Sequence, residues 1–70
     1  MKLNSSNASP SRAIRLPAVA SLTGMSRATI WRRVHDDPSF PKPFKLSAGV
    51  TVWREDAIFA WLAAKQHAAA

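Results

Sequence analysis

The chain has no cysteine, only two glycines and only four acidic residues, and it has no long hydrophobic run. Without cysteine there is neither a disulfide framework nor a thiolate zinc site, which fits a reducing compartment. The longest uninterrupted apolar run is 57–64, whereas a bilayer-spanning helix needs about 20 residues. No secretory signal precedes it. We therefore expect a soluble protein of the cytoplasm, without a membrane partner.

The same scarcities argue against an enzyme. Two glycines form no glycine-rich phosphate loop, and four acids are too few for a two-metal nuclease. The two histidines, His35 and His67, have no companion at metal-ligand spacing. We expect no catalytic residue, no metal, no cofactor and no small-molecule substrate.

What the chain does have is positive charge on a small body. Seventy residues make one small domain, near the size at which a single core only just offsets chain entropy. Thirteen of its apolar residues are alanines, so three Trp and three Phe must carry much of the core. Ten Lys and Arg against four acids give a net charge of +6. Such a bias predicts a polyanionic partner.

Composition divides the chain into three parts. Residues 1–13 are rich in Ser, Asn and Ala without an apolar period, which predicts a disordered N-terminal arm. Residues 14–66 show no linker and no repeat and are expected to form one domain. The alanine-rich end, 67–70, is expected to fray.

Two helices joined by a short turn are predicted in the first half of the domain. Leu16-Pro17 opens a helix of about 17–23, and Gly24 is a natural stop because only glycine takes the left-handed cap without steric cost. The Ser26 hydroxyl is placed to cap a second helix of about 27–35. This is the spacing of a helix-turn-helix.

The second half predicts a hairpin and a last helix. Three prolines make 37–43 an extended connector. Apolar residues on both sides of the turn at 47–49 indicate a β-hairpin over 44–53, and the apolar spacing within 55–66 indicates a third helix. The expected fold is mainly α with a small β-hairpin, a winged helix-turn-helix.

The second helix carries the candidate DNA contacts. With Ile30 and Val34 turned inward, a helical projection places Ala28, Thr29 and Arg32 farthest from the core and Arg27, Trp31 and Arg33 on the flanks. Lys and Arg attract phosphates, and an Arg fork can bind guanine O6 and N7. A lone Arg would be read as a solubilising surface residue, but three on one capped helix favour binding.

The hairpin and Trp31 each have two interpretations. Around the turn, Lys42, Lys45, Ser47 and Thr51 form either a wing along the DNA or a cover over the core edge. Trp53 and Trp61 fall at core phases. Trp31 suits both core packing and an indole N–H aimed at a phosphate.

Three segments together resemble a known family. They are RLPAVASLTGMSRATIWRR at 15–33, FPKPFKL at 40–46 and VWREDAIFAWL at 52–62. The combination of G-x-S-R-x-T-I-[YW], F-P-x-P and W-R-x5-[FAVIL]-x-W-L is similar to the AlpA family of short phage and prophage regulators. That family in turn resembles excisionases and the winged helix-turn-helix of the MerR superfamily.

The resemblance implies sequence-specific binding of double-stranded DNA, with the second helix in the major groove and the hairpin as wing. Family members regulate transcription of integrase genes on mobile elements or act as recombination directionality factors, and the sequence does not choose between them. The matching positions are Ser26, Arg27, Thr29, Trp31 and Arg32 on the recognition helix, Ile30 as core, Lys45 on the wing, and Trp53 and Arg54 at the start of the third helix.

Two other classes stay open. An RNA-binding module would suit the charge, but it normally shows exposed aromatics on a sheet. A protein-interaction adaptor could use Phe59, which falls off the buried phase of the last helix. The same residue could instead serve self-association of DNA-bound copies on repeated sites.

Overall fold

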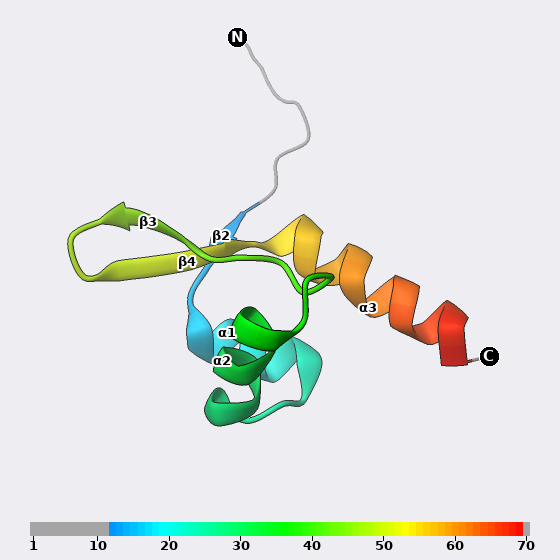
Figure 1. Cartoon of the computed structure of the whole chain (residues 1–70). Helices are drawn as coiled ribbons and strands as arrows, with labels where there is room; N and C mark the ends of the chain where they lie inside the picture. The colour runs from blue at the N-terminus through cyan, green and yellow to red at the C-terminus, as the bar shows by residue number, and fades with distance from the viewer. Residues whose placement is uncertain (1–11, 70) are drawn as a thin grey trace, which may run out of the picture.

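The computed structural model describes residues 12–69, so most of the predicted arm, 1–11, and residue 70 lie outside the described residues. A short turn joins the first two helices, and a hairpin precedes the third (Figure 1). The fold is a mainly α winged helix-turn-helix, as predicted. Its elements are β2 (Ala13–Ile14), α1 (Leu16–Thr23), α2 (Arg27–Asp36), β3 (Phe44–Ser47), β4 (Val50–Arg54) and α3 (Glu55–Ala69).

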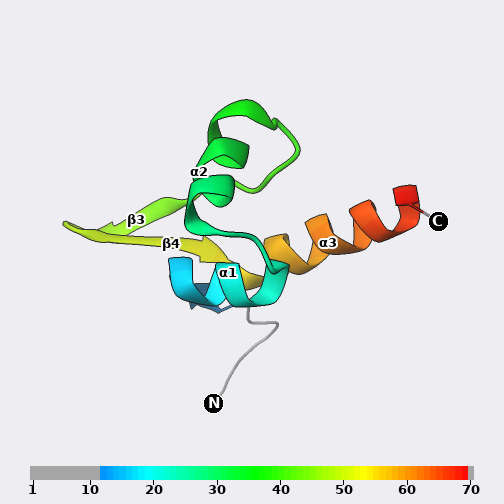
Figure 2. The same cartoon turned by 90° about the horizontal axis from the view of Figure 1, so that it is seen from below.

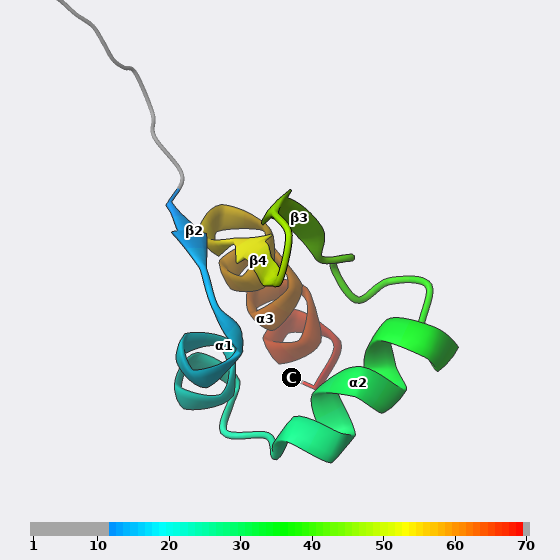
Figure 3. The same cartoon turned by 90° about the vertical axis from the view of Figure 1, so that its left-hand side faces the viewer.

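The sheet is antiparallel, with strand order β2-β4-β3. Phe44 lies opposite Val52 and Lys45 opposite Thr51, and the register shifts between Lys45 and Ser47. The hairpin extends to one side of the molecule and α3 to the other (Figures 1 and 2). Seen from the hairpin side, α1 and α2 lie below the strands (Figure 3).

Strand β2 corrects the predicted domain boundary. Ala13, placed by the sequence in a disordered arm, pairs with Arg54 of β4. Arg12 is also part of the fold, because its Nη2 lies 2.6 Å from Glu55 Oε2 and its carbonyl accepts the Glu55 N–H at 2.8 Å. A two-residue strand has no period to detect. The domain therefore begins before Ile14.

One core joins all three helices and the sheet. Trp53 is fully buried and Trp61 is 9% exposed, which confirms that both are core residues. Phe40, from the connector, packs edge-on against Trp61 with ring centroids 4.9 Å apart. The remaining buried residues of this cluster are Ile14, Val19, Ile30 and Ile58. The core fixes α2 against the base of the hairpin.

The end of α1 agrees with the prediction, whereas both ends of α3 differ from it. Gly24 ends α1 with φ of 73°, the left-handed cap that the sequence predicted. Helix α3 continues to Ala69, past the predicted end at about residue 66, because alanine, the best helix former, meets no stop signal there. Trp53 and Arg54 are the last residues of β4 and not the start of α3.

Candidate nucleic-acid interface

Helix α2 begins with a side-chain cap. The Ser26 hydroxyl oxygen accepts the Thr29 backbone N–H at 3.2 Å, and the hydroxyl donates to Thr29 Oγ1 at 3.0 Å. This contact satisfies one of the backbone donors that a helix leaves free at its first turn. The capped first turn holds Arg27 and Ala28 at the exposed start of the helix.

The inward face of α2 lies where the helical projection put it, whereas the outward face differs from the projection at Thr29. Ile30 is fully buried and Val34 is half-buried against the core. On the opposite side, Ala28 and Arg32 are exposed, and Thr29 is half-buried. The outermost strip of the helix therefore presents one small and one forked cationic side chain.

Three of the predicted basic contacts are engaged within the fold. Arg33 Nη1 lies 3.1 Å from Asp37 Oδ2, and its guanidinium is 5.7 Å from the Trp61 ring centroid. Lys42 Nζ donates to the Val34 carbonyl, one of the free carbonyls in the last turn of α2. Arg54 binds Asp56 through two nitrogens, at 3.1 and 2.9 Å. Each of these cations has a structural partner of its own.

Four exposed cations have no such partner. Among residues 12–68, no hydrogen bond or ion pair engages the side chain of Arg15, Arg27, Arg32 or Lys45. Arg27 and Arg32 belong to α2, and Lys45 lies across the hairpin from Thr51. Arg15 immediately precedes α1. These four side chains keep their full capacity for phosphates and bases.

A cleft lies between α1, α2 and the hairpin. We call it the hairpin cleft, and it is lined by Arg15, Leu16, Pro17, Arg27, Trp31, Gly49 and Thr51. Sequence reasoning missed Arg15, because it read the Leu16-Pro17 pair only as a helix start. Its position directly before a helix of the predicted DNA-binding unit was the available signal.

Trp31 packs on the core with part of its surface exposed, which agrees with the first of its two predicted roles; its contact with a phosphate stays a prediction. Its ring packs against Trp53 with centroids 5.5 Å apart and a 51° tilt, yet the residue is 38% exposed. It also lines the hairpin cleft. The side chain thus supports the core from one face and offers the other to a ligand.

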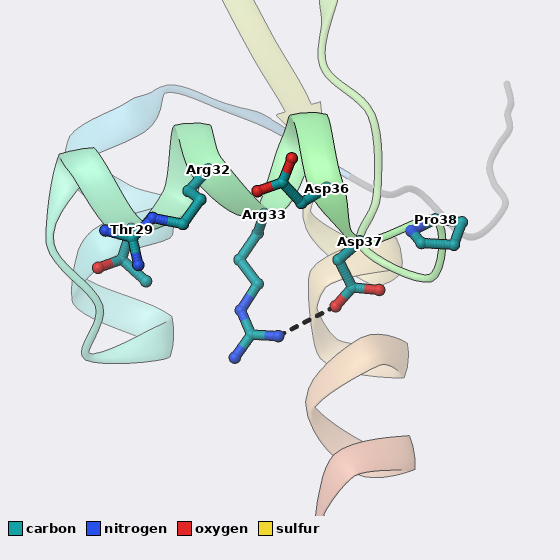
Figure 4. A pocket seen from close by; sticks show the side chains of 6 residues that line it. All are labelled: Thr29, Arg32, Arg33, Asp36, Asp37 and Pro38. Carbon is teal, nitrogen blue, oxygen red and sulfur yellow. Dashed lines mark hydrogen bonds and ion pairs between the residues drawn. The ribbon is translucent and has the colours of Figure 1, made fainter.

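A second hollow borders the other flank of α2. Figure 4 shows Arg33 reaching toward the Asp37 carboxylate, while Arg32 runs back along the helix toward Thr29. Asp36 and Pro38 complete the lining. Two adjacent arginines of one helix therefore have different surroundings, one held in the fold and one open.

The turn of the hairpin is exposed and narrow. Ser47 and Gly49 are exposed, and Thr51 is half-buried. Gly49 has φ of 79°, a conformation that other residues adopt only with strain, although a Cβ there would meet no atom within 4 Å. The backbone of the turn is open to close approach by another molecule.

Two of the carboxylates are held in their charged form by local partners. The Ser39 hydroxyl and backbone N–H donate to Asp37 and lower the pKa of its carboxyl. The hydrogen bond from Arg12 lowers the pKa of Glu55. Asp37 lies at the C-terminal end of α2 and Glu55 at the start of α3. Neither lines the hairpin cleft, whose lining includes two arginines and no acid.

Within 12–69, no three histidine, cysteine or acidic side chains gather where they could hold a metal ion. In the same range, no helix is both long and apolar enough to span a membrane.

The sequence matches a known family model over most of the domain. The model is described as the prophage CP4-57 regulatory protein, AlpA, and it matches residues 12–66. The chain belongs to the AlpA family. The AlpA match includes Arg12 and Ala13, which the structure shows in contact with Glu55 and Arg54.

A curated AlpA relative is similar along most of its length. It is the "DNA-binding transcriptional activator AlpA" of Escherichia coli strain K12, 41% identical over 61 residues, covering 80% of this chain and 87% of that protein. No solved structure matches the chain.

Proposed function

We propose that the chain is a sequence-specific double-stranded DNA-binding protein that regulates transcription. The proposal rests on the exposed cations: four of them make no hydrogen bond or ion pair within residues 12–68, and two of these four belong to the capped second helix. Helix α2 has ten residues, about 15 Å of helix. The major groove, about 12 Å wide, admits such a helix. The name of the AlpA relative supports the same function.

The geometry suggests that different residues contact the bases and the phosphates. Arg32, which is exposed and on the outermost strip of α2, is the candidate for a guanine edge, and Ala28 beside it suits an apolar contact with a thymine methyl. Arg27 and Lys45 are candidates for phosphates, with Ser47 and Thr51 as hydroxyl donors from the hairpin. Arg33, Lys42 and Arg54 stay in the fold, and we leave them out of the interface.

Selection from a randomised duplex pool tests this function. We expect the full chain to enrich one discrete motif, and a variant with Arg32→Ala to enrich a motif with one position relaxed. Lys65→Ala is a control matched in charge, because it removes one positive charge from α3 and none from α2. The Lys65 Nζ lies 5.5 Å from the centroid of the Trp61 ring. Recovery of unenriched sequence by the unaltered protein would contradict the proposal.

A finer proposal is that the target lies beside a mobile-element gene for integration or excision. The family description, a prophage regulatory protein, supports it. A transcription factor and a recombination directionality factor differ in DNA bending. Bending of the selected site, measured by end-to-end energy transfer, would favour the directionality factor, and reporter transcription with little bending would favour the regulator.

Exposed apolar residues support self-association on repeated sites as an accessory function. Phe44 is 42%, Leu46 59% and Phe59 49% exposed. Phe44 lies opposite Val52 on one face of the sheet, and Thr51 lies on the other face. Sedimentation on duplexes with one and two sites tests this: cooperative filling of the second site supports it, and independent filling contradicts it.

A further inference from the structure

Three segments that are distant in the sequence meet at the hairpin cleft. Arg15 precedes α1, Arg27 begins α2, and Gly49 belongs to the turn between β3 and β4. In the view from the hairpin side, the strands lie above and the two helices below (Figure 3). The cleft is thus the boundary between the proposed recognition helix and the wing.

The cleft concentrates positive charge without a counter-charge. The guanidinium groups of Arg15 and Arg27 are exposed and, within residues 12–68, have no ion-pair or hydrogen-bond partner. Like charges gathered at one concave site repel each other unless an anion joins them. Thr51 adds a hydroxyl and Trp31 an indole to the same lining. The arrangement therefore provides several donors and two positive charges for one anionic group.

Duplex geometry indicates which anion would occupy this place. Each sugar-phosphate strand separates a major groove from the adjacent minor groove. A protein that places α2 in the major groove and its hairpin along the neighbouring minor groove must straddle one strand. The phosphates of that strand then pass between α2 and the hairpin, where the cleft lies.

We propose that the hairpin cleft clamps a backbone phosphate of the straddled DNA strand, with Arg15 as a positioning residue beside Arg27. This inference rests on the proposed DNA-binding function. Arg15 contributes no base contact in this arrangement. It fixes the register of α2 on the duplex, because phosphate contacts position a protein while base contacts specify the sequence.

The test uses the selected duplex with single phosphates replaced, one at a time, by neutral methylphosphonates. For the unaltered protein, neutralising one or two adjacent phosphates should weaken binding about tenfold, as expected for a charge-assisted contact. Arg15→Ala should weaken binding to the unmodified duplex and should be less sensitive than the unaltered protein to neutralisation at those positions, because only Arg27 still contacts that phosphate. Arg15→Lys, which keeps the charge, should retain the sensitivity.

Folding and total charge are controlled in the same experiment. The Arg15 side chain makes no hydrogen bond within residues 12–68, and its carbonyl still accepts the Ala18 and Val19 N–H groups when the side chain is removed, so Arg15→Ala should unfold at the temperature of the unaltered protein. Lys65→Ala removes one charge from α3 and should reproduce the methylphosphonate profile of the unaltered protein. Together these variants separate a local contact from a loss of charge.

The outcomes distinguish this inference from the function on which it rests. Equal methylphosphonate profiles for the unaltered protein and Arg15→Ala, with duplex binding intact, would overturn the clamp alone. Absence of a selected duplex for the unaltered protein would overturn both. The clamp is supported if Arg15→Ala and Arg27→Ala, and no other variant, bind with reduced sensitivity to methylphosphonate replacement at one local group of phosphates.

Discussion

Arg32 and Arg33 are adjacent arginines whose replacement should have different consequences. Arg32 is exposed and, among residues 12–68, has no hydrogen-bond or ion-pair partner. Arg33 is bound to Asp37 and lies over Trp61. Each change to alanine removes one positive charge from the same helix, so the two variants are matched in charge and in helix propensity.

The structure sets the expected magnitudes. Arg32→Ala should cost about 1–3 kcal/mol on the selected duplex, the range for a forked Arg contact to a base, which corresponds to a roughly 5- to 150-fold higher Kd. Its effect on unfolding should stay within about 0.5 kcal/mol. Arg33→Ala removes a half-buried i,i+4 ion pair and a cation–π contact, together about 1 kcal/mol of unfolding free energy. That loss lowers Tm by about 4–8 °C in a domain of this size.

Fluorescence anisotropy and thermal unfolding separate the two effects. Binding is measured against the selected duplex and against every single-base-pair substitution of it, below the Tm of both variants. Arg32→Ala should lose discrimination at one base pair, whereas Arg33→Ala should keep the base preferences of the unaltered protein. The reasoning is refuted if Arg33→Ala loses base preference while Arg32→Ala weakens all duplexes equally.

Three further predictions concern the hairpin, the helix cap and acid stability. Lys45→Ala should weaken every duplex to a similar extent and make the slope of log K against log salt shallower by about one unit, and an unchanged slope in a salt titration would remove Lys45 from the interface. Ser26→Ala deletes the acceptor of the Thr29 N–H and should cost about 1 kcal/mol in denaturant unfolding, whereas Ser26→Asp, which can still cap, should not. Hydrogen bonds from Ser39 lower the pKa of Asp37 below its ordinary value of 3.8, so its stabilisation is present above that value and is lost as the pH falls through the lower, folded value. Unfolding curves from pH 6 to 2 should therefore fall less steeply for Asp37→Asn than for the unaltered protein, and parallel curves would show that this carboxylate adds no acid sensitivity.

Helix α2 could be predicted because its signals are local. Ser26 is a cap by residue type and place, and the spacing of Ile30 and Val34 fixes the inward direction of a regular helix. Gly24 marks the end of α1 by the same local logic. The fold class followed from the order of such elements, and the family motifs agree with it.

The parts that could not be predicted depend on contacts between distant segments. Strand β2 exists only because β4 pairs with it, and two residues carry no pattern of their own. The partners of Lys42 and Arg54 are set by the path of the connector and by the strand-to-helix junction, which residue type does not reveal. Arg15 joins the cleft only when α1 and the hairpin are brought together.

A competition titration at physiological salt tests the central claim most directly. Labelled selected duplex is bound by the full chain and displaced by unlabelled selected duplex, random duplex or single-stranded RNA of equal length. We predict that the selected duplex competes at least a thousandfold more effectively than either of the others, the lower bound of the range for specific over non-specific DNA binding. Equal displacement by all three would show that the net charge of +6 alone produces binding, and would contradict sequence-specific DNA recognition by α2.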